Sequence, residues 1–247
     1  MEVIAGFLIA MMVAMTGVGA GIVTVPFLIT FAGLPPHMAV GTALVYSFVI
    51  KTFLVPMAAV RRQIHWRTLA WMLAGGLPGV IAGSFLIRYL KGANQPVLQF
   101  VLGAMIASVA IIHWRASLKG VERGTANRPQ LLGALMSGVG VEVGFSSAGA
   151  GALGALALMS LTTLTTAEVV GTDLAFGLGL SLIGGGLHWQ AGHLDTTVVV
   201  KLITGGIAGA MVGAFLTTRV KAASLRGAVA MAVLVAGLHL CWKSLHT

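Results

Sequence analysis

The chain has 247 residues, of which 57% are hydrophobic and 9% are charged, and its formal net charge is +9. Because a soluble domain is about one quarter charged, this composition excludes an ordinary water-soluble globule and indicates a protein whose solvent is lipid. The basic residues are dispersed over short polar gaps without a nucleic-acid motif, so they are expected to orient a membrane protein and not to bind nucleic acid.

The first apolar stretch, residues 3–32, is interrupted by glycines at 17, 19 and 21. The about 14 residues before this break would reach roughly 20 Å as a helix, which is two thirds of a hydrocarbon core of about 30 Å. The stretch is therefore predicted to be either one discontinuous span or a re-entrant V. Leu34-Pro35-Pro36 marks a turn, and unbroken spans are predicted at 38–59, 68–87 and 97–114.

The second half follows the same plan after a polar stretch at 115–130. Residues 131–163 are apolar and broken near 146–151, and spans are predicted at 166–187, 197–217 and 227–242. The continuous apolar runs do not alternate as in a β-barrel. The predicted fold class is an all-α polytopic membrane protein, with a single membrane domain over 1–247.

The two halves match at a constant offset. Val170-Gly171-Thr172 follows Val40-Gly41-Thr42 by 130 residues, and Phe215-Leu216 follows Phe85-Leu86 by the same interval. We interpret 3–114 and 131–244 as two internal repeats of about four membrane segments each, with the first segment of each repeat broken by glycines and 115–130 as the loop between them.

The relative orientation of the repeats depends on the broken segments. If they cross the membrane, the repeats are parallel. If they are re-entrant, each half crosses three times, the repeats are inverted, and ten basic residues in the loops 61–67, 115–128 and 219–226 fall on one side. The other side then keeps Arg88, Lys91 and Lys243. The positive-inside rule favours the inverted arrangement, with both termini facing away from the cytoplasm.

The two glycine breaks are the candidate substrate site. Non-helical backbone at membrane depth is tolerated only where protein or a water-filled cavity satisfies it, and a helix that starts after a break presents free amides to an anion. The alternative is that small residues only permit close helix packing, which we favour for Gly75, Gly76, Gly79 and Gly83. The predicted substrate-binding residues of the breaks, with two threonines near the start of matching helices, are Thr16, Gly19, Gly21, Thr42, Ser146, Ser147, Gly149, Gly151 and Thr172.

Three charged residues fall within apolar spans. Lys51 lies near the middle of 38–59, too deep to reach the interface easily, and is predicted either to attract an anion or to form a structural ion pair with Glu142 or Asp173. Glu142 and Asp173 are candidates for proton coupling or gating. For Asp173 the alternative is an N-terminal cap of the span at 166–187.

Other readings have less support. Gly144-Phe145-Ser146 resembles the serine of an intramembrane protease, but a duplicated site argues against an enzyme. The histidines His188 and His193 are read as loop residues, where with Asp195 they are weak evidence for a metal. We therefore expect no metal and no cofactor. The expected partners are a small anionic substrate and the lipid bilayer, with a homo-oligomer left open.

At this point the chain resembles a known family. Gly17-Val18-Gly19-Ala20-Gly21 and the following Val25-Pro26-Phe27-Leu28 are similar to the GxGGGxxxVPxL signature of the sulfite exporter TauE/SafE family. The second copy, from Ser147 to Leu158, lacks the proline and one glycine, and Asp173 stands where the family typically has a small residue. The resemblance implies a permease of the bacterial inner membrane that exports sulfite or an organosulfur anion. With no GxxxxGK[ST] motif for ATP, we expect secondary transport by alternating access, and a channel for small anions or solutes is the alternative.

Overall fold

The computed structural model describes residues 1–247 except 18, 91–94, 120–123, 125–126, 217–221 and 246–247. The described residues form ten helices and no strand, namely α1 (Glu2–Thr16), α2 (Ala20–Thr30), α3 (Pro36–Val60), α4 (Trp66–Leu90), α5 (Gln95–Lys119), α6 (Pro129–Ser146), α7 (Leu153–Leu161), α8 (Thr166–Gln190), α9 (Thr196–Leu216) and α10 (Ala222–Leu245). Five of these helices, α3, α4, α5, α8 and α9, contain apolar segments of 21 or 25 residues, which are long enough to cross a membrane. The predicted all-α, multi-span fold class is confirmed.

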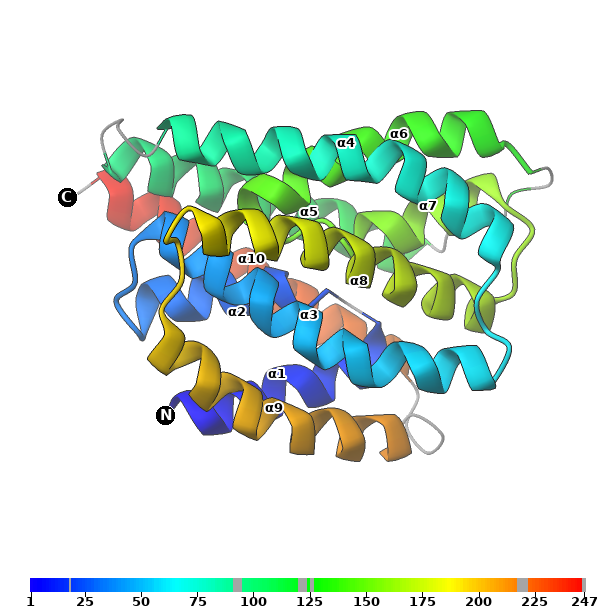
Figure 1. Ribbon diagram of the computed structural model, residues 1–247, viewed down its shortest axis with the longest axis horizontal. Helices are drawn as coiled ribbons and strands as arrows, with labels where there is room; N and C mark the ends of the chain where they lie inside the picture. The colour runs from blue at the N-terminus through cyan, green and yellow to red at the C-terminus, as the bar shows by residue number, and fades with distance from the viewer. Residues whose placement is uncertain (18, 91–94, 120–123, 125–126, 217–221, 246–247) are drawn as a thin grey trace.

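The two glycine breaks each turn the chain back on itself. α1 begins and α2 ends at one end of the bundle, whereas α6 begins and α7 ends at the opposite end (Figure 1). With 15 and 11 residues, α1 and α2 are each too short to cross about 30 Å of hydrocarbon at a rise of about 1.5 Å per residue. Each broken segment therefore follows the path of a re-entrant V, and the two enter from opposite ends.

The breaks begin with the same backbone device. α1 ends at Gly17, which has a left-handed φ of 70° and donates its amide to the carbonyl oxygen of Val13. α6 ends at Ser147, which has a φ of 63° and donates its amide to Val143 in the same way. A left-handed residue that caps a helix is ordinarily glycine, because a side chain is strained there. The serine at 147 is therefore an exception that the surrounding structure must hold in place.

Close helix packing uses the small residues of α4 and α9. A Cβ atom on Gly75 or Gly79 of α4 would collide with backbone carbonyl oxygens of α6. In the same way, a Cβ atom on Gly205 or Gly209 of α9 would collide with carbonyl oxygens of α1. These glycines let α4 pack on α6 and α9 pack on α1, which is the packing role that the sequence predicts for them.

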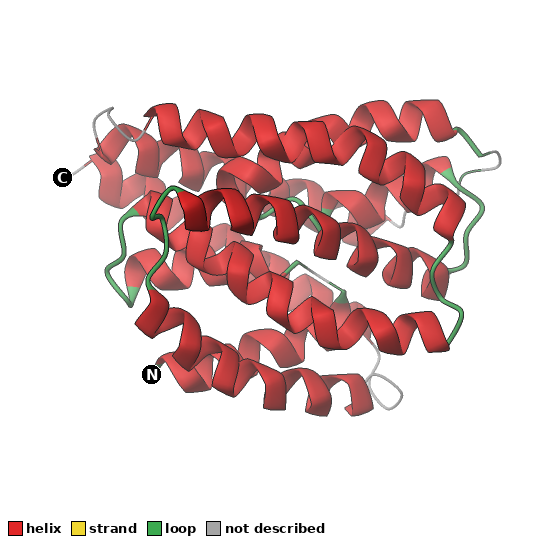
Figure 2. Cartoon of the chain, viewed as in Figure 1, coloured by secondary structure: helices red, strands yellow, loops and turns green. Residues whose placement is uncertain are grey.

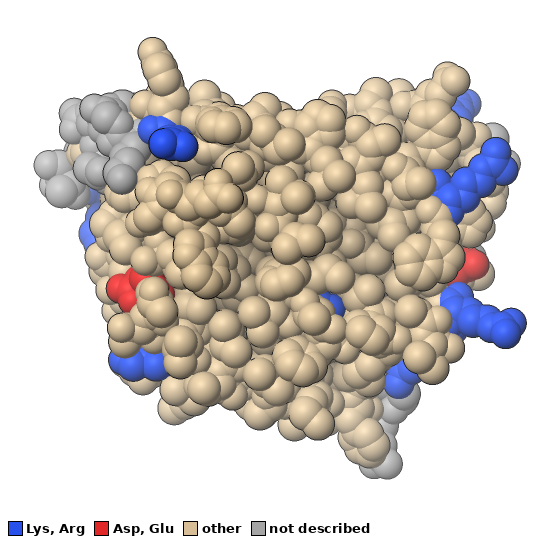
Figure 3. All heavy atoms as spheres, in the orientation of Figure 1, with Lys and Arg blue, Asp and Glu red and all other residues tan. Residues whose placement is uncertain are grey.

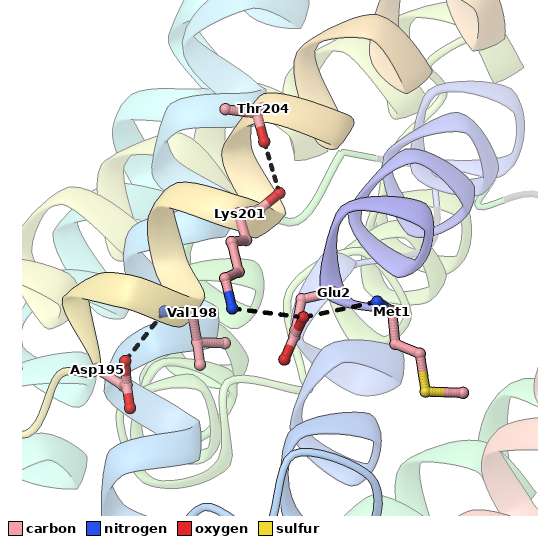
Figure 4. Close-up of polar contacts among 6 residues, drawn as sticks. All are labelled: Met1, Glu2, Asp195, Val198, Lys201 and Thr204. Atoms are coloured by element: carbon pink, nitrogen blue, oxygen red, sulfur yellow. Dashed lines mark hydrogen bonds and ion pairs between the residues drawn. The ribbon is translucent and has the colours of Figure 1, made fainter.

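The charges mark the two ends of the bundle. Basic side chains gather at both ends of the molecule, and the broad surface between them is almost free of charge (Figure 3). At one end, the Glu2 carboxylate lies 3.8 Å from the Lys201 ammonium, and Asp195 accepts the Val198 amide at 3.0 Å, so that α1 and α9 begin side by side (Figure 4). The long axis in Figure 3 is therefore the direction in which the helices cross a bilayer. The predicted charges at Lys91, Arg123, Arg219 and Lys221 lie outside the described residues.

Candidate functional site

The two breaks meet inside the bundle. Both are non-helical segments midway along its length, whereas the other loops lie at its ends (Figure 2). A Cβ atom on Gly19 would collide with the carbonyl oxygen of Ala150, and one on Gly21 would collide with the carbonyl oxygen of Ser147. Gly151, with a φ of 98°, is equally close to the amide of Gly19. The backbones of the breaks are thus in direct contact, and they bring together the residues that the sequence predicts there.

A helix starts from each break with free amides. α2 has Gly19 as its N-cap and α7 has Ala152, and neither helix has a side chain that accepts a hydrogen bond from its first turn. The first amides of a helix have no intrahelical acceptor and carry the positive end of its dipole. Two such ends near the middle of the bundle present hydrogen-bond donors to an anion.

Lys51 points from α3 toward this region. Its side chain is only 4% exposed, and a Cβ atom on Gly177 of α8 would collide with its ammonium nitrogen and approach the Cβ of Ala150. The ion pairs among the described residues are those of Glu2 with the N-terminus and with Lys201, so Lys51 forms no direct ion pair there. Its ammonium interacts electrostatically with Asp173 at longer range. Of the two predicted acidic partners, Asp173 is the one that faces it.

The interpretation of Asp173 as a helix cap is wrong. α8 begins at Thr166, and its cap is Thr165, which forms a capping box with Glu168 in which the side chain of each accepts the other's backbone amide. Asp173 lies two turns further along the helix and is 3% exposed. Its Oδ1 atom lies against Gly154 of α7 and has no hydrogen-bond partner among the described residues. A buried carboxylate with an unsatisfied oxygen is a feature of functional sites more than of packing.

Glu142 and the serines form the second polar group at the breaks. The Ser146 hydroxyl donates a hydrogen bond to Oε1 of Glu142, one helical turn away in α6. The other carboxylate oxygen of Glu142 lies against Gly149, and the Ser147 hydroxyl lies against Gly21. Both of these atoms are buried without a hydrogen-bond partner in the described part of the chain. Buried donors and acceptors that stay unsatisfied cost stability, which points to a ligand or water as the missing partner.

The predicted threonines have visible structural contacts. The hydroxyl of Thr42 accepts the amide of Asp195 at 3.2 Å, and that of Thr172 accepts the amide of His65 at 3.0 Å. Both therefore hold loops at the ends of α3 and α8, and neither is the first residue of its helix. Thr16, the last residue of α1, donates its hydroxyl to the carbonyl oxygen of Met12 at 2.6 Å. A contact of these threonines with substrate stays a prediction.

A cavity leads from one end of the bundle to the first break. It has a volume of about 320 Å³ and is lined by Thr16, by Val170 and Leu174 of α8, and by Arg61 and Gln63 in the loop between α3 and α4. Val170 also lies against Gly17. The sequence did not predict this cavity, because its wall combines four separate helices. It supplies a water-accessible route of the size that a small solute needs.

Comparisons with known proteins agree with this architecture. The family model described as "Sulfite exporter TauE/SafE" matches residues 3–240. A probable membrane transporter protein, YjnA of Bacillus subtilis (strain 168), is 30% identical over 251 residues, which cover 96% of this chain and 98% of that protein. Two probable membrane transporter proteins of Xylella fastidiosa are 25% and 24% identical, each over 97% of this chain and 93% of their own length. No solved structure matches the chain.

Proposed function

Because the chain belongs to the sulfite exporter TauE/SafE family, a family of membrane transporters and not of enzymes, we propose that it is a secondary transporter of a small anion. The proposed substrate is sulfite or a related organosulfur anion, which the protein exports across the bacterial inner membrane. The observation that carries this proposal is the meeting of two helix breaks with the buried ammonium of Lys51 beside them.

The proposed binding site uses donors from both breaks. The ammonium of Lys51 supplies the charge, and the first amides of α2 and α7 supply directed hydrogen bonds. The buried hydroxyl of Ser147 has no partner among the described residues and is a further donor. A small oxyanion with several acceptor oxygens would satisfy these groups together, since hydrogen bonds to a charged acceptor are the stronger ones.

Two inverted repeats belong to this proposal. Its support is a set of contacts that recur with the halves exchanged, as in the amides of Asp195 and His65, which donate to Thr42 and Thr172 respectively. Each position in one pair lies 130 residues from its counterpart in the other. The packing of α4 on α6 recurs in the same way as the packing of α9 on α1. Two inverted halves around a central site are a common basis for alternating access.

Proton coupling follows from the charges at the breaks. Lys51 contributes one positive charge, whereas Asp173 and Glu142 would contribute two negative charges if both were ionised. That net charge of −1 would repel an anion, so binding requires that at least one carboxylate takes up a proton. We therefore propose that the anion and a proton bind together, with Asp173 and Glu142 as the proton-accepting groups.

The test is transport by purified protein in liposomes. Sulfite flux is measured with and without a pH gradient for the wild type, Lys51→Ala and Lys51→Arg. Loss of a charged hydrogen bond of about 1.5–3 kcal/mol predicts that Lys51→Ala lowers the apparent affinity for sulfite at least about tenfold. Lys51→Arg should retain part of the activity, because it keeps the charge.

The matched control is Lys201→Ala, which removes an exposed lysine that pairs with Glu2 at the end of the bundle. Because exposed ion pairs contribute little, this variant should transport like the wild type. Full sulfite transport by Lys51→Ala would remove Lys51 from the site. A flux that shows no saturation and no response to the pH gradient would favour a channel.

A further inference from the structure

A second polar cavity lies at the other end of the bundle, opposite the loop that contains Arg61. Its volume is about 80 Å³, and it is lined by the last turns of α4 and α8 and by the loop that follows α8, with Ser84, Arg88, His188, Gln190 and His193 as its polar residues. About 10–15 Å³ of such volume is enough for one water molecule, so the cavity has room for a small oxyanion. It is separate from the helix breaks described above.

Two buried groups of this cavity lack partners. The Ser84 side chain is 5% exposed, and its hydroxyl has no hydrogen-bond partner in the described part of the chain. Other buried hydroxyls in helices of this chain bond back to a carbonyl one turn earlier, as Thr24 does to Ala20 and Ser181 to Gly177. The hydroxyl of Ser84 stays available to a ligand, although the same local bond is open to it.

His188 presents a defined nitrogen to the cavity. Its side chain is 1% exposed, and its Nε2 atom lies 3.1 Å from the carbonyl oxygen of Gly144. Because a carbonyl oxygen only accepts hydrogen bonds, Nε2 is the donor, and Nδ1 of the neutral ring is an acceptor. Nδ1 is buried and has no partner among the described residues. The cavity therefore offers an acceptor at His188, a hydroxyl donor at Ser84 and the guanidinium of Arg88.

From this set of groups we propose that the cavity binds a small oxyanion that carries one acidic O–H group, such as hydrogensulfite. Arg88 pairs with its anionic oxygens, Ser84 donates to one of them, and its O–H donates to Nδ1 of His188. Gly144, which holds the other nitrogen of His188, lies two residues before Ser146 at the second break. The cavity thus extends the proposed transport site, on which this inference rests, toward the end of the bundle away from the basic loops.

The repeat offset shows that these polar groups are not needed by the architecture. The positions 130 residues from Ser84, His188 and His193 are Ala214, Ala58 and Gln63. All three line the 320 Å³ cavity at the opposite end, so the two cavities occupy equivalent places. Two alanines fill that place at the Arg61 end, whereas a serine and a histidine fill it here. The polar set therefore belongs to one face of the membrane only.

The test is calorimetric titration of the detergent-purified protein, in a mildly acidic buffer, with sulfite and with sulfate. The Lys51→Ala variant serves as the background, because it removes the charge of the central site. We expect this variant to keep one sulfite site, to bind sulfate at least about tenfold more weakly, and to lose about tenfold in sulfite affinity when Ser84→Ala or His188→Ala is added. The control substitution is Tyr89→Phe, at a side chain that is 86% exposed beside Arg88, and it should change nothing.

The outcomes separate the two proposals. If Lys51→Ala binds no sulfite, or if Ser84→Ala and Arg88→Gln bind sulfite as their background does, the cavity is not an anion site, whatever the transport assay shows. If sulfate binds as tightly as sulfite, the role of His188 as an acceptor is overturned. Should the wild type transport no sulfite while the cavity still binds it, the proposed function fails and the cavity site stands. Ser84→Ala removes no hydrogen bond within the described residues, so a folding defect would not account for its effect.

Discussion

The contact between the two helix breaks makes Gly19 the most sensitive position for a minimal substitution. In Gly19→Ala, the new Cβ atom would collide with the carbonyl oxygen of Ala150, with the carbonyl carbon at 2.9 Å and the Cα of Gly151 at 3.7 Å. Carbon atoms pack at about 3.5–4.0 Å, and the obstructing atoms are backbone, which a rotamer change does not move. Relief requires that one break shifts against the other.

Overpacking typically costs about 1–3 kcal/mol, and a rigid backbone on both sides places Gly19→Ala near the upper value. For a chain of this size, about 3 kcal/mol corresponds to a loss of roughly 6–12 °C in Tm. The assay is thermal unfolding of the purified protein together with sulfite flux in liposomes, and we expect both Tm and flux to fall.

Gly138 and Gly186 provide matched controls, because they are exposed helical glycines and a Cβ atom on either would meet nothing within 4 Å. Alanine is favoured over glycine in a helix by up to about 1 kcal/mol, so Gly138→Ala and Gly186→Ala should unfold at or slightly above the wild-type Tm. If Gly19→Ala unfolds and transports as these controls do, the breaks are not in contact in the working protein.

Two further predictions concern the relation between the halves. Thr42→Val and Thr172→Val each leave one loop amide without its acceptor, so both should lower stability by similar amounts, about 1–3 kcal/mol, in thermal unfolding; a loss in only one variant would contradict equivalent roles. In a Cys241→Ser background, Arg61→Cys and Ala191→Cys lie 130 residues apart in loops at opposite ends of the bundle, and a membrane-impermeant thiol reagent should label them from opposite sides. Labelling of both from the same side would exclude inverted repeats.

The glycine breaks were predictable because their signal is local and duplicated. A run such as Gly17–Gly21 cannot continue a helix through lipid without help, and the constant offset paired it with Ser147–Gly151. The contact between the two breaks and the path of each chain were not contained in that signal. They depend on how α1 and α6 pack on α9 and α4, which follows from small residues on other helices.

Helix ends were predicted less well, for two different reasons. The hydrophobic window ended the span at 187, but α8 continues through Gln190, so His188 is a buried helical residue and not a loop residue. At the other end of α8 the Thr165-x-x-Glu168 capping box was present in the sequence and outweighs Asp173 as a start signal. Once the helix starts at Thr166, Asp173 falls on its buried face, and the cap interpretation fails.

The pairing of Lys51 with Asp173 and not with Glu142 was beyond sequence reasoning. Both acids lie in the second half, and the choice between them depends on the rotation of α3 against α8. The nearest residues to the two charges, Gly177 and Gly154, carry no side chain and leave no pattern in the sequence. What selects the partner is therefore space beside a glycine, which appears only when the helices are packed.

The two halves share their contacts but not their charges, and this difference has a mechanical consequence. The counterparts of Lys51, Asp173 and Glu142 are Ser181, Ala43 and Met12, so no architectural need common to both halves explains the charges. Because Lys51 belongs to the first half and both carboxylates to the second, any rocking of one half against the other changes the distance between opposite charges. Their attraction falls with that distance, and an anion bound at Lys51 would replace what is lost. Occupation of the site would then lower the cost of moving between the two open states, as alternating access requires.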